Sequence, residues 1–204
     1  KLNLDLSVGP VRPDGFHELA TVYQALSLFD ELEVSERGDG RGLRLSVGGR
    51  ETAGVPTGPD NLAWRAAELA AEAYGRVPDL SITIDKGIPV AGGMAGGSAD
   101  AAGVLRACAQ LWDPSGEAEP ELGDLAARLG SDVPFALLGG TAVGSGRGET
   151  VTSAMGSGKF HWVLALSEGQ LSTPAVYRKL DEIRGSGATP RPAVRTEVLL
   201  AARA

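Results

Sequence analysis

The sequence predicts an α+β protein, in which short strands and helices follow one another along 204 residues. Apolar and polar residues alternate over 1–8 and again over 80–85, the period of a half-buried strand. Over 101–112 and 173–183 the apolar residues instead recur at helical spacing. A glycine-rich loop joins the second strand pattern to the first helical one, and it is the most informative stretch of the chain.

Composition excludes several classes of protein. A net charge of −7 argues against a nucleic-acid-binding surface, although a small nucleotide needs only a local cluster of cations and amides. No apolar run is long enough to span a bilayer and no basic segment precedes an apolar signal, so we expect no membrane partner and a cytoplasmic location. Cys108 is the single cysteine, which rules out a disulfide framework and predicts a core thiol.

The chain opens with an alternating strand over residues 1–8, followed by a turn region from Gly9 to Gly15. Its two predicted faces are an apolar one and a polar one, made respectively of Leu2, Leu4, Leu6 and Val8 and of Lys1, Asn3 and Asp5. A solvated strand surface would explain the polar face equally well. Because the sequence begins without methionine, we expect further residues before Lys1 in the full protein.

Several elements are predicted between the first turn and the glycine-rich loop. We expect them to form an early antiparallel sheet and then a helix, with strands at 22–28, 31–34 and 43–47, a loop at 51–59 and a helix from 60 to 73. The pair Phe16-His17 directly follows the first turn. It is either an incidental surface pair or a clasp for a planar base, the aromatic ring stacking and the histidine hydrogen bonding.

The glycine-rich loop runs from Pro89 to Asp100, between the strand at 80–85 and the next helix. Its four glycines allow backbone N–H groups to turn toward an anion, and a helix start adds partial positive charge. We therefore predict a phosphate site, with Ser98 or Asp100 capping the helix. Gly92 and Gly97 have the spacing of a Walker loop, but serine stands where that loop needs lysine. A mobile surface loop is the alternative.

The second half of the chain shows weaker patterns. We expect an exposed connector at 113–123, a helix at 125–129, a strand and turn at 139–148, an apolar strand at 160–166, and helices at 173–183 and 198–202. Asp132 lies between a glycine turn and an apolar run, and a helix cap would account for it without any function. A composition shift near 150–159 predicts two domains, 1–153 and 154–204.

Three stretches together resemble the GHMP kinase superfamily: Lys1-Leu2-Asn3-Leu4, the loop 89–100, and Gly130-Ser131-Asp132-Val133-Pro134-Phe135. The resemblance implies a GHMP kinase fold, with an N-terminal domain like ribosomal protein S5 domain 2 and a C-terminal α/β-plait domain. The third motif of the superfamily, a glycine- and serine-rich loop, does not occur before Ala204. We therefore expect the second domain to be incomplete in this sequence.

The resemblance also assigns roles to single residues. Asp132 would receive or orient the proton of the substrate hydroxyl, and Lys1 would neutralise charge on that carboxylate, on the hydroxyl or on the moving phosphoryl group. Asn61 and Lys86 would contact adenosine. The residues implied to wrap the phosphates of ATP, with Mg²⁺ expected beside it, are Pro89, Val90, Ala91, Gly92, Gly93, Met94, Ala95, Gly96, Gly97 and Ser98.

Within the superfamily, Arg12-Pro13-Asp14-Gly15-Phe16-His17-Glu18-Leu19 resembles the branch that phosphorylates the 2-hydroxyl of a cytidine diphosphate-linked methylerythritol in non-mevalonate isoprenoid synthesis. Phe16, which replaces a common tyrosine, would stack on cytosine and His17 would hydrogen bond to it. Further contacts with this small-molecule substrate are implied for Asn3, Thr173 and Tyr177. Tyr177 would form the second face of the stacking sandwich.

Two alternatives stay open at this point. Another kinase of the superfamily, acting on homoserine or a mevalonate derivative, would share the loop but would not need stacking surfaces for a base. A non-catalytic nucleotide-binding module would keep the loop without the Lys1 and Asp132 pair. The sequence fixes neither the oligomeric state nor the metal ligands.

Overall fold

The structure is a computed structural model that describes residues 1–50, 52–90, 92–116, 122–156, 158–165, 171–185, 187 and 189–202. Ala91 of the glycine-rich loop lies outside the described residues. The described elements, in chain order, are β1 (Leu2–Val11), β2 (His17–Gln24), β3 (Glu31–Glu36), β4 (Arg44–Gly49), α1 (Leu62–Ala73), β5 (Leu80–Lys86), α2 (Gly96–Trp112), α3 (Leu122–Leu129), α4 (Val133–Leu138), β6 (Thr141–Gly146), β7 (Thr150–Ser153), α5 (Thr173–Arg184) and α6 (Thr196–Ala201).

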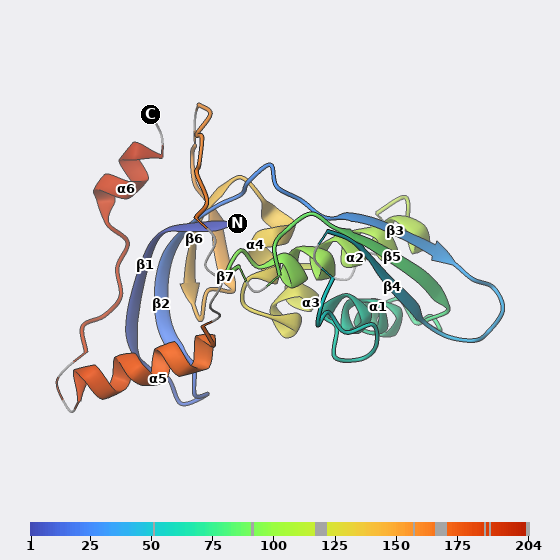
Figure 1. The fold of residues 1–204 in the computed structure, drawn as a ribbon, viewed down its shortest axis with the longest axis horizontal. Helices are drawn as coiled ribbons and strands as arrows, with labels where there is room; N and C mark the ends of the chain where they lie inside the picture. Colours follow the sequence, from blue (N-terminus) through green and yellow to red (C-terminus); the bar gives the residue numbers. More distant parts are fainter. Residues whose placement is uncertain are drawn as a thin grey trace.

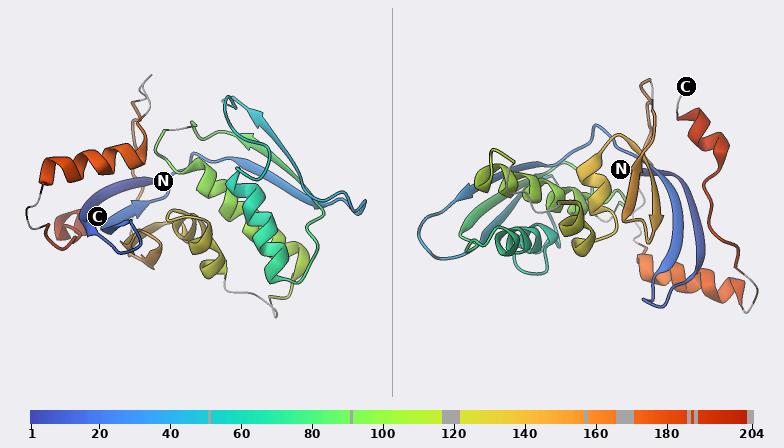
Figure 2. Two further views of the ribbon diagram at one scale, coloured as in Figure 1. Left: turned by 90° about the horizontal axis from the view of Figure 1, so that it is seen from below. Right: turned by 180° about the vertical axis from the view of Figure 1, so that it is seen from behind.

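Two sheets lie at opposite ends of the molecule with helices between them (Figure 1). The first sheet has the order β1-β2-β6-β7 and is antiparallel throughout. The second has the order β3-β5-β4, in which β5 is antiparallel to β3 and parallel to β4. Helices α1 and α2 pack side by side against the second sheet, and α5 crosses the end of β1 and β2 (Figure 2). The fold is therefore α+β, as the sequence predicts.

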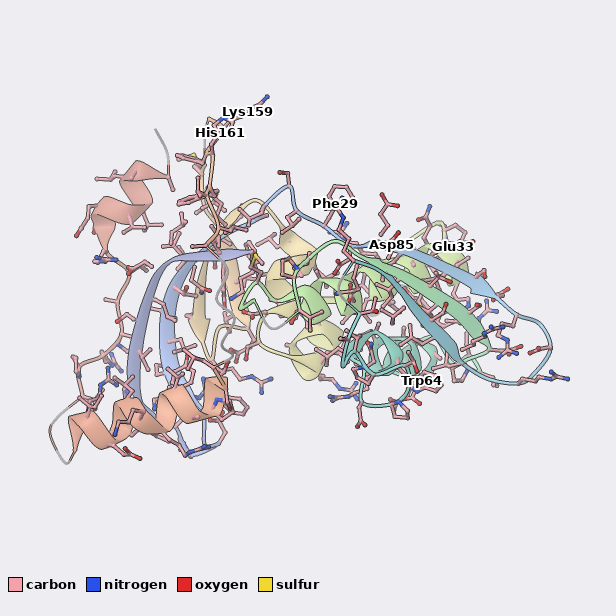
Figure 3. All side chains as sticks on the ribbon, in the orientation of Figure 1. Phe29, Glu33, Trp64, Asp85, Lys159 and His161 are labelled. Carbon is pink, nitrogen blue, oxygen red and sulfur yellow. The ribbon has the colours of Figure 1, made fainter. Side chains whose placement is uncertain are left out.

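The main core lies between the second sheet and helices α1 to α3. Alternate residues of β5 (Leu80, Ile82 and Ile84) point into it and are fully buried, so its other face is left to solvent. Figure 3 shows Glu33 and Asp85 on that outer face and Trp64 on α1. The inner face of α1 consists of alanines, whose small side chains let α1 and α2 approach closely. This core holds β5 and α2, and therefore both ends of the glycine-rich loop.

The early part of the chain does not form the single antiparallel sheet expected from the sequence. The strand expected at 22–28 starts earlier, at His17, and ends at Gln24, where it pairs with β1 and β6. The strands expected at 31–34 and 43–47 exist, but they belong to the second sheet, where the later β5 separates them. Local alternation identifies a strand, whereas its partners depend on packing that comes from distant segments.

The expected faces of the first strand are also partly wrong. A register shift between Asn3 and Asp5 interrupts the pairing of β1 with β2. Past this irregularity, Leu6 is exposed while Asp5 is buried, where its carboxylate accepts hydrogen bonds from the backbone and side chain of Arg195. An extra residue in one strand exchanges its two faces, so simple alternation fails beyond it.

Two further expectations need correction. Neither Ser98 nor Asp100 caps α2: the N-cap position is Ala95, in a left-handed conformation with φ of 61°, and no side chain caps the helix. The apolar stretch expected as a strand at 160–166 forms no strand over 160–165, the part of it that the structure describes. Figure 3 places Lys159 and His161 near the outer tip of this segment. The helices expected at 60–73, 125–129, 173–183 and 198–202 are confirmed as α1, α3, α5 and α6.

Candidate active site

The fold brings Lys1 and Asp132 together from distant parts of the sequence. Lys1 precedes β1, and Asp132 occupies the N-cap position of α4, where its side chain makes no capping hydrogen bond. The Lys1 Nζ lies 3.3 Å from Asp132 Oδ2 and donates to Asn3 Oδ1 at 2.7 Å. Asn3 donates in turn to Thr21 Oγ1 at 2.7 Å. The helix-cap explanation for Asp132 is therefore wrong, and its carboxylate faces a cation instead.

Tyr23 forms the floor beneath this pair. Its ring lies 5.1 Å from Lys1 Nζ, a cation–π distance, and stacks on Phe135 of α4 with centroids 4.7 Å apart. Burial first, and then the Asp132 carboxylate, raise the pKa of the Tyr23 hydroxyl. The phenol thus stays neutral, and the two rings hold β2 against α4 so that Lys1 and Asp132 keep their positions.

The glycine-rich loop lines a cavity of about 370 Å³ at the start of α2. The first N–H groups of any helix lack partners within the helix, and here no side chain caps them, so they are available to an anion. Gly93 has a φ of +70°, and a Cβ on Gly92 would lie only 3.0 Å from the Met94 side chain. The described loop residues from 89 to 97, with Asn61 and Lys86, line this cavity. Ser98, on the first turn of α2, is not among the lining residues.

Asn61 and Lys86 already have protein partners at the cavity wall. The Asn61 side chain caps α1 by accepting from the Ala63 N–H at 2.8 Å, and it donates to the Pro56 carbonyl at 2.7 Å. The Lys86 ammonium is buried and donates to Asp30 Oδ2 at 2.6 Å and to Asp100 Oδ2 at 2.7 Å. The expectation that both residues contact adenosine remains a prediction, and neither side chain is free in this structure.

Asp100 is the weakly paired member of this ionic cluster. Its Oδ1 is buried without a hydrogen-bond partner among the described residues. Burial raises the pKa of Asp100 to about 7, the Lys86 ammonium opposing this shift, while Asp30 raises it further. The same ammonium and the Ile88 backbone N–H lower the pKa of Asp30 against its own burial. The cluster therefore gains a proton on Asp100 near neutral pH.

A second, smaller cavity contains the Lys1 and Asp132 side chains. It measures about 190 Å³ and extends to Phe29 and Leu32, at the entrance to the second sheet. Ile88, Met94 and Ala95 line both this cavity and that of the glycine-rich loop. The Lys1 backbone nitrogen also donates to the Met94 carbonyl at 3.0 Å. A phosphate in the loop and a hydroxyl beside Asp132 would thus lie on either side of the wall formed by Ile88, Met94 and Ala95.

The residues expected to hold a cytosine gather at the other end of β2. His17 is nearly buried and stacks on Tyr177 of α5 with centroids 4.8 Å apart, while its Nε2 lies 2.9 Å from Asp181 Oδ1. Phe16 is 47% exposed, and the Arg147 guanidinium lies 4.9 Å from its ring centre. Thr173 is exposed at the start of α5. Tyr177 thus stacks on the histidine with one face, and the Phe16 ring is partly exposed beside Arg147; stacking of either ring on cytosine stays a prediction.

Tyr177 also connects this group with the Lys1 and Asp132 pair. Burial, and then the Asp132 carboxylate, raise the pKa of the Tyr177 hydroxyl, which places this hydroxyl within electrostatic range of Asp132. His17 and Tyr23 share one face of β2 and are six residues apart, or roughly 20 Å along an extended strand. The aromatic residues around His17 and the ionic pair beside Tyr23 thus lie toward opposite ends of β2.

Sequence reasoning did not identify several residues of this site. Asp30, Tyr23 and Asp181 carry no local motif, because each acts through a partner far away in the sequence. Asp100 was identified only as a possible cap, although its position one helical turn after Gly96 could have indicated an inward-facing carboxylate. Two larger cavities measure about 750 and 740 Å³: the first shares Ala25, Leu26 and Leu28 with the cavity of the Lys1 and Asp132 pair, and the second shares no lining residue with it. We assign them no ligand.

Comparison with known proteins agrees with this arrangement. Residues 61–140 match the family model of the GHMP kinases N terminal domain. A 4-diphosphocytidyl-2-C-methyl-D-erythritol kinase of Nocardia farcinica is 55% identical over 191 residues, covering 94% of this chain and 61% of the relative. The enzyme of the same name from Streptomyces coelicolor is 50% identical over 199 residues, covering 98% of this chain and 66% of the relative.

Solved structures point the same way. A crystal structure of 4-(cytidine 5'-diphospho)-2C-methyl-D-erythritol kinase has a TM-score of 0.62 at 37% identity, over 87% of this chain and 60% of that one. The mevalonate pyrophosphate decarboxylase from Streptococcus pyogenes has a TM-score of 0.61 over 85% of this chain and 55% of that one; at 13% identity it shows the fold alone. The chain thus has a GHMP-type kinase fold, and its residues 61–140 match the N-terminal domain of that family. It spans about three-fifths of the length of the curated relatives that it matches.

Proposed function

We propose that this chain carries the active site of an ATP-dependent small-molecule kinase whose substrate is 4-diphosphocytidyl-2-C-methyl-D-erythritol. One observation carries the proposal. The cavity of the Lys1 and Asp132 pair and the cavity of the glycine-rich loop share Ile88, Met94 and Ala95 as lining residues. A phosphate donor in one cavity and a hydroxyl acceptor in the other would therefore bind next to each other. The names of the relatives at 50–55% identity support the choice of substrate.

The chemistry follows from the positions of these groups. The substrate hydroxyl oxygen attacks the γ-phosphorus of ATP, the bond from that phosphorus to the β,γ-bridging oxygen breaks, and ADP leaves. Asp132 orients the hydroxyl and receives its proton. Lys1 offsets the negative charge that gathers between the carboxylate and the moving phosphoryl group. Such transfer depends on positioning and charge neutralisation more than on covalent catalysis.

The distance along β2 supports a long substrate. A hydroxyl beside Asp132 and a base beside Phe16 and His17 would be joined by a linker spanning roughly 20 Å of strand at most. A nucleoside diphosphate linked to a small polyol has such a length, whereas homoserine or mevalonate would occupy only the ionic end. We propose that cytosine lies on the exposed face of Phe16, with Asn3 and Thr173 contacting other parts of the substrate.

Mg²⁺ is proposed as the companion of ATP. Within the described ranges, no group of three or more His, Cys, Asp or Glu side chains is placed to hold a metal ion. When bound, the ion neutralises phosphate charge, and Lys1 and the α2 N–H groups complete that task. No described helix could cross a membrane. The cytoplasmic location and the boundary between residues 153 and 154 stay predictions.

The proposal is tested by transfer assays on the protein with ATP and three acceptors: 4-diphosphocytidyl-2-C-methyl-D-erythritol, homoserine and mevalonate. We expect ADP formation to depend on the first acceptor and phosphate to appear on its 2-hydroxyl. Phosphorylation of homoserine or mevalonate instead would identify a different kinase of the family. Binding of an ATP analogue without transfer to any acceptor would indicate a non-catalytic nucleotide-binding module.

A further inference from the structure

A buried ionic cluster lies beneath the glycine-rich loop. It consists of Lys86 at the end of β5, Asp30 just before β3, and Asp100 in α2. Their side chains are exposed by only 3%, 1% and 3%. Removing three charges from water is costly, and apolar side chains of similar volume often replace such clusters without loss of stability. The position of the cluster therefore calls for a specific explanation.

Each carboxylate of the cluster is tied to a different end of the loop. Asp30 uses its second oxygen, Oδ1, to accept hydrogen bonds from the backbone N–H groups of Gly87 at 2.7 Å and Ile88 at 2.8 Å. These two residues lead from β5 into the loop. Asp100 is the last residue of the 89–100 stretch and lies in the first turns of α2. The single ammonium of Lys86 therefore connects the entry of the loop with its exit.

The backbone at the loop exit rests directly on this ammonium. A Cβ added at Gly96, the first residue of α2, would lie 3.3 Å from Lys86 Nζ and 3.2 Å from Ile88 Cγ2. Such distances are tighter than ordinary van der Waals contact. The absence of a Cβ at Gly96 therefore allows the start of α2 to pack closely against Lys86. Its neighbour Ala95 keeps a left-handed conformation that costs about 1–2 kcal/mol for a residue with a Cβ. The loop thus has a strained shape and a support under it.

We infer that Lys86, Asp30 and Asp100 are positioning residues that staple the two ends of the glycine-rich loop and so hold it in its phosphate-binding shape. This inference rests on the proposed function in so far as the loop binds ATP. It also assigns to Lys86 a role different from a direct contact with adenosine, because two carboxylates already hold its ammonium. The bonds of the staple reach neither Lys1 nor Asp132. Asp30 also lines the cavity of that pair, but its two carboxylate oxygens are bonded to the loop entry and to Lys86, so we expect the staple to act on nucleotide binding.

The test compares two Asp30 variants with a matched surface variant. Asp30→Ala removes the ion pair and the acceptor of the two amides, whereas Asp30→Asn keeps an acceptor oxygen. Asp39→Asn is the control, because Asp39 pairs with Arg37 in an exposed turn far from the loop. Amide hydrogen exchange is followed at Gly87 and Ile88 without ligand, and affinities are measured for a non-hydrolysable ATP analogue and for cytidine diphosphate.

We expect Asp30→Ala to speed exchange of the two amides at least tenfold and to weaken binding of the ATP analogue at least tenfold. Asp30→Asn should give intermediate values, and Asp39→Asn should match the unaltered chain. Affinity for cytidine diphosphate should change less than twofold in all three. Unchanged exchange and unchanged affinity for the ATP analogue in a folded Asp30→Ala variant would overturn the inference, and so would equal losses for both ligands together with faster exchange throughout the chain.

A second variant guards against unfolding caused by an unpaired buried charge. Lys86→Met combined with Asp30→Asn and Asp100→Asn removes all three charges and the link between the loop ends, but it keeps at position 30 an acceptor oxygen for the two backbone donors. We expect this protein to fold, to lose at least tenfold in affinity for the ATP analogue, and to keep its affinity for cytidine diphosphate. If the unaltered chain binds no ATP analogue, the proposed function fails, while the exchange of Gly87 and Ile88 still decides whether the staple exists.

Discussion

Lys1 Nζ and Asp132 Oδ2 lie 3.3 Å apart, although Lys1 precedes β1, the first strand, and Asp132 precedes α4, after five of the seven described strands. Their side chains are 12% and 30% exposed, and both line the smaller cavity. Asn3 fixes the lysine from one direction and the Tyr23 ring from below. An acid and a cation held in this way, with an open side toward bound ligands, are suited to receive a hydroxyl group.

Replacing either member of this pair should stop transfer without preventing nucleotide binding. For Asp132→Asn, and for Lys1→Ala, we expect turnover to fall by about 10²–10⁴, since a group that positions or accepts the proton is lost. Affinity for an ATP analogue should change little, because neither side chain lines the cavity of the glycine-rich loop. Steady-state kinetics and calorimetry check the two parts. Near-normal turnover in either variant would contradict the assigned roles.

The stability of the protein should respond to pH through Asp100. Its pKa of about 7 in the folded state lies above the ordinary value of 3.8, so the folded chain keeps a proton that the unfolded chain releases. The stabilising contribution of this proton is complete below about pH 4 and is lost as the pH rises through 7. Relative to Asp100→Asn, the unaltered chain should lose on the order of a few kcal/mol of unfolding free energy between pH 4 and pH 8.

Urea unfolding of both proteins at several pH values measures this difference. Asp39→Asn serves as the reference for loss of an exposed, paired carboxylate. Parallel stability curves for the unaltered chain and Asp100→Asn would show that the pKa of Asp100 is the same in the folded and the unfolded chain.

Gly96→Ala should weaken binding of an ATP analogue. The new methyl group would press on Lys86 Nζ and Ile88 Cγ2, which must shift by a few tenths of an ångström. We expect affinity for an ATP analogue to fall about tenfold, roughly 1.4 kcal/mol. Gly123→Ala, in α3 with open space around the added atom, is the matched control and should leave affinity unchanged. Equal affinities in the two variants would argue against close packing of the loop on Lys86.

The aromatic end of the site should act on the cytidine ligand alone. We expect Phe16→Ala and Tyr177→Leu each to raise the dissociation constant of cytidine diphosphate about 2- to 12-fold, the worth of one aromatic contact. Val176→Ala, an exposed neighbour on α5, is the control. Binding of the ATP analogue should be unaffected in all three. Unchanged affinity for cytidine diphosphate in Phe16→Ala would place the base site elsewhere.

Cys108 should report on unfolding. The thiol is fully buried in the main core, and this burial raises its pKa to about 12. Because the thiolate is the reactive form, we expect no labelling by a thiol reagent under native conditions and complete labelling in denaturant. Rapid labelling of the native protein would show that α2 does not pack as described.

Sequence patterns predicted most single elements correctly because each depends on local periodicity. The helix at α1 follows from its Asn61 cap, and β5 from the alternation of Leu80, Ile82 and Ile84. They did not predict which strands would pair, since β3 and β4 meet only through β5. The side-chain faces of β1 depend on an irregularity that leaves no signal in the residue types.

The candidate site divides in the same manner. The glycine-rich loop is visible in the sequence because glycine itself is the signal, and the resemblance to a kinase superfamily added Lys1 and Asp132. The roles of these residues in catalysis and binding stay predictions until they are measured. The ionic support under the loop was not predicted, because Asp30 and Asp100 are ordinary acidic residues until folding brings them to Lys86.

The wall made of Ile88, Met94 and Ala95 has a consequence for how this protein could change over evolutionary time. Each of these side chains borders both cavities, so a substitution that suits one ligand is felt by the other. A substitution at Ile88, Met94 or Ala95 is therefore expected to affect the binding of both ligands. A descendant adapting to a different alcohol would have to vary the far end of β2, around Phe16 and His17, where only one of the two ligands is in reach.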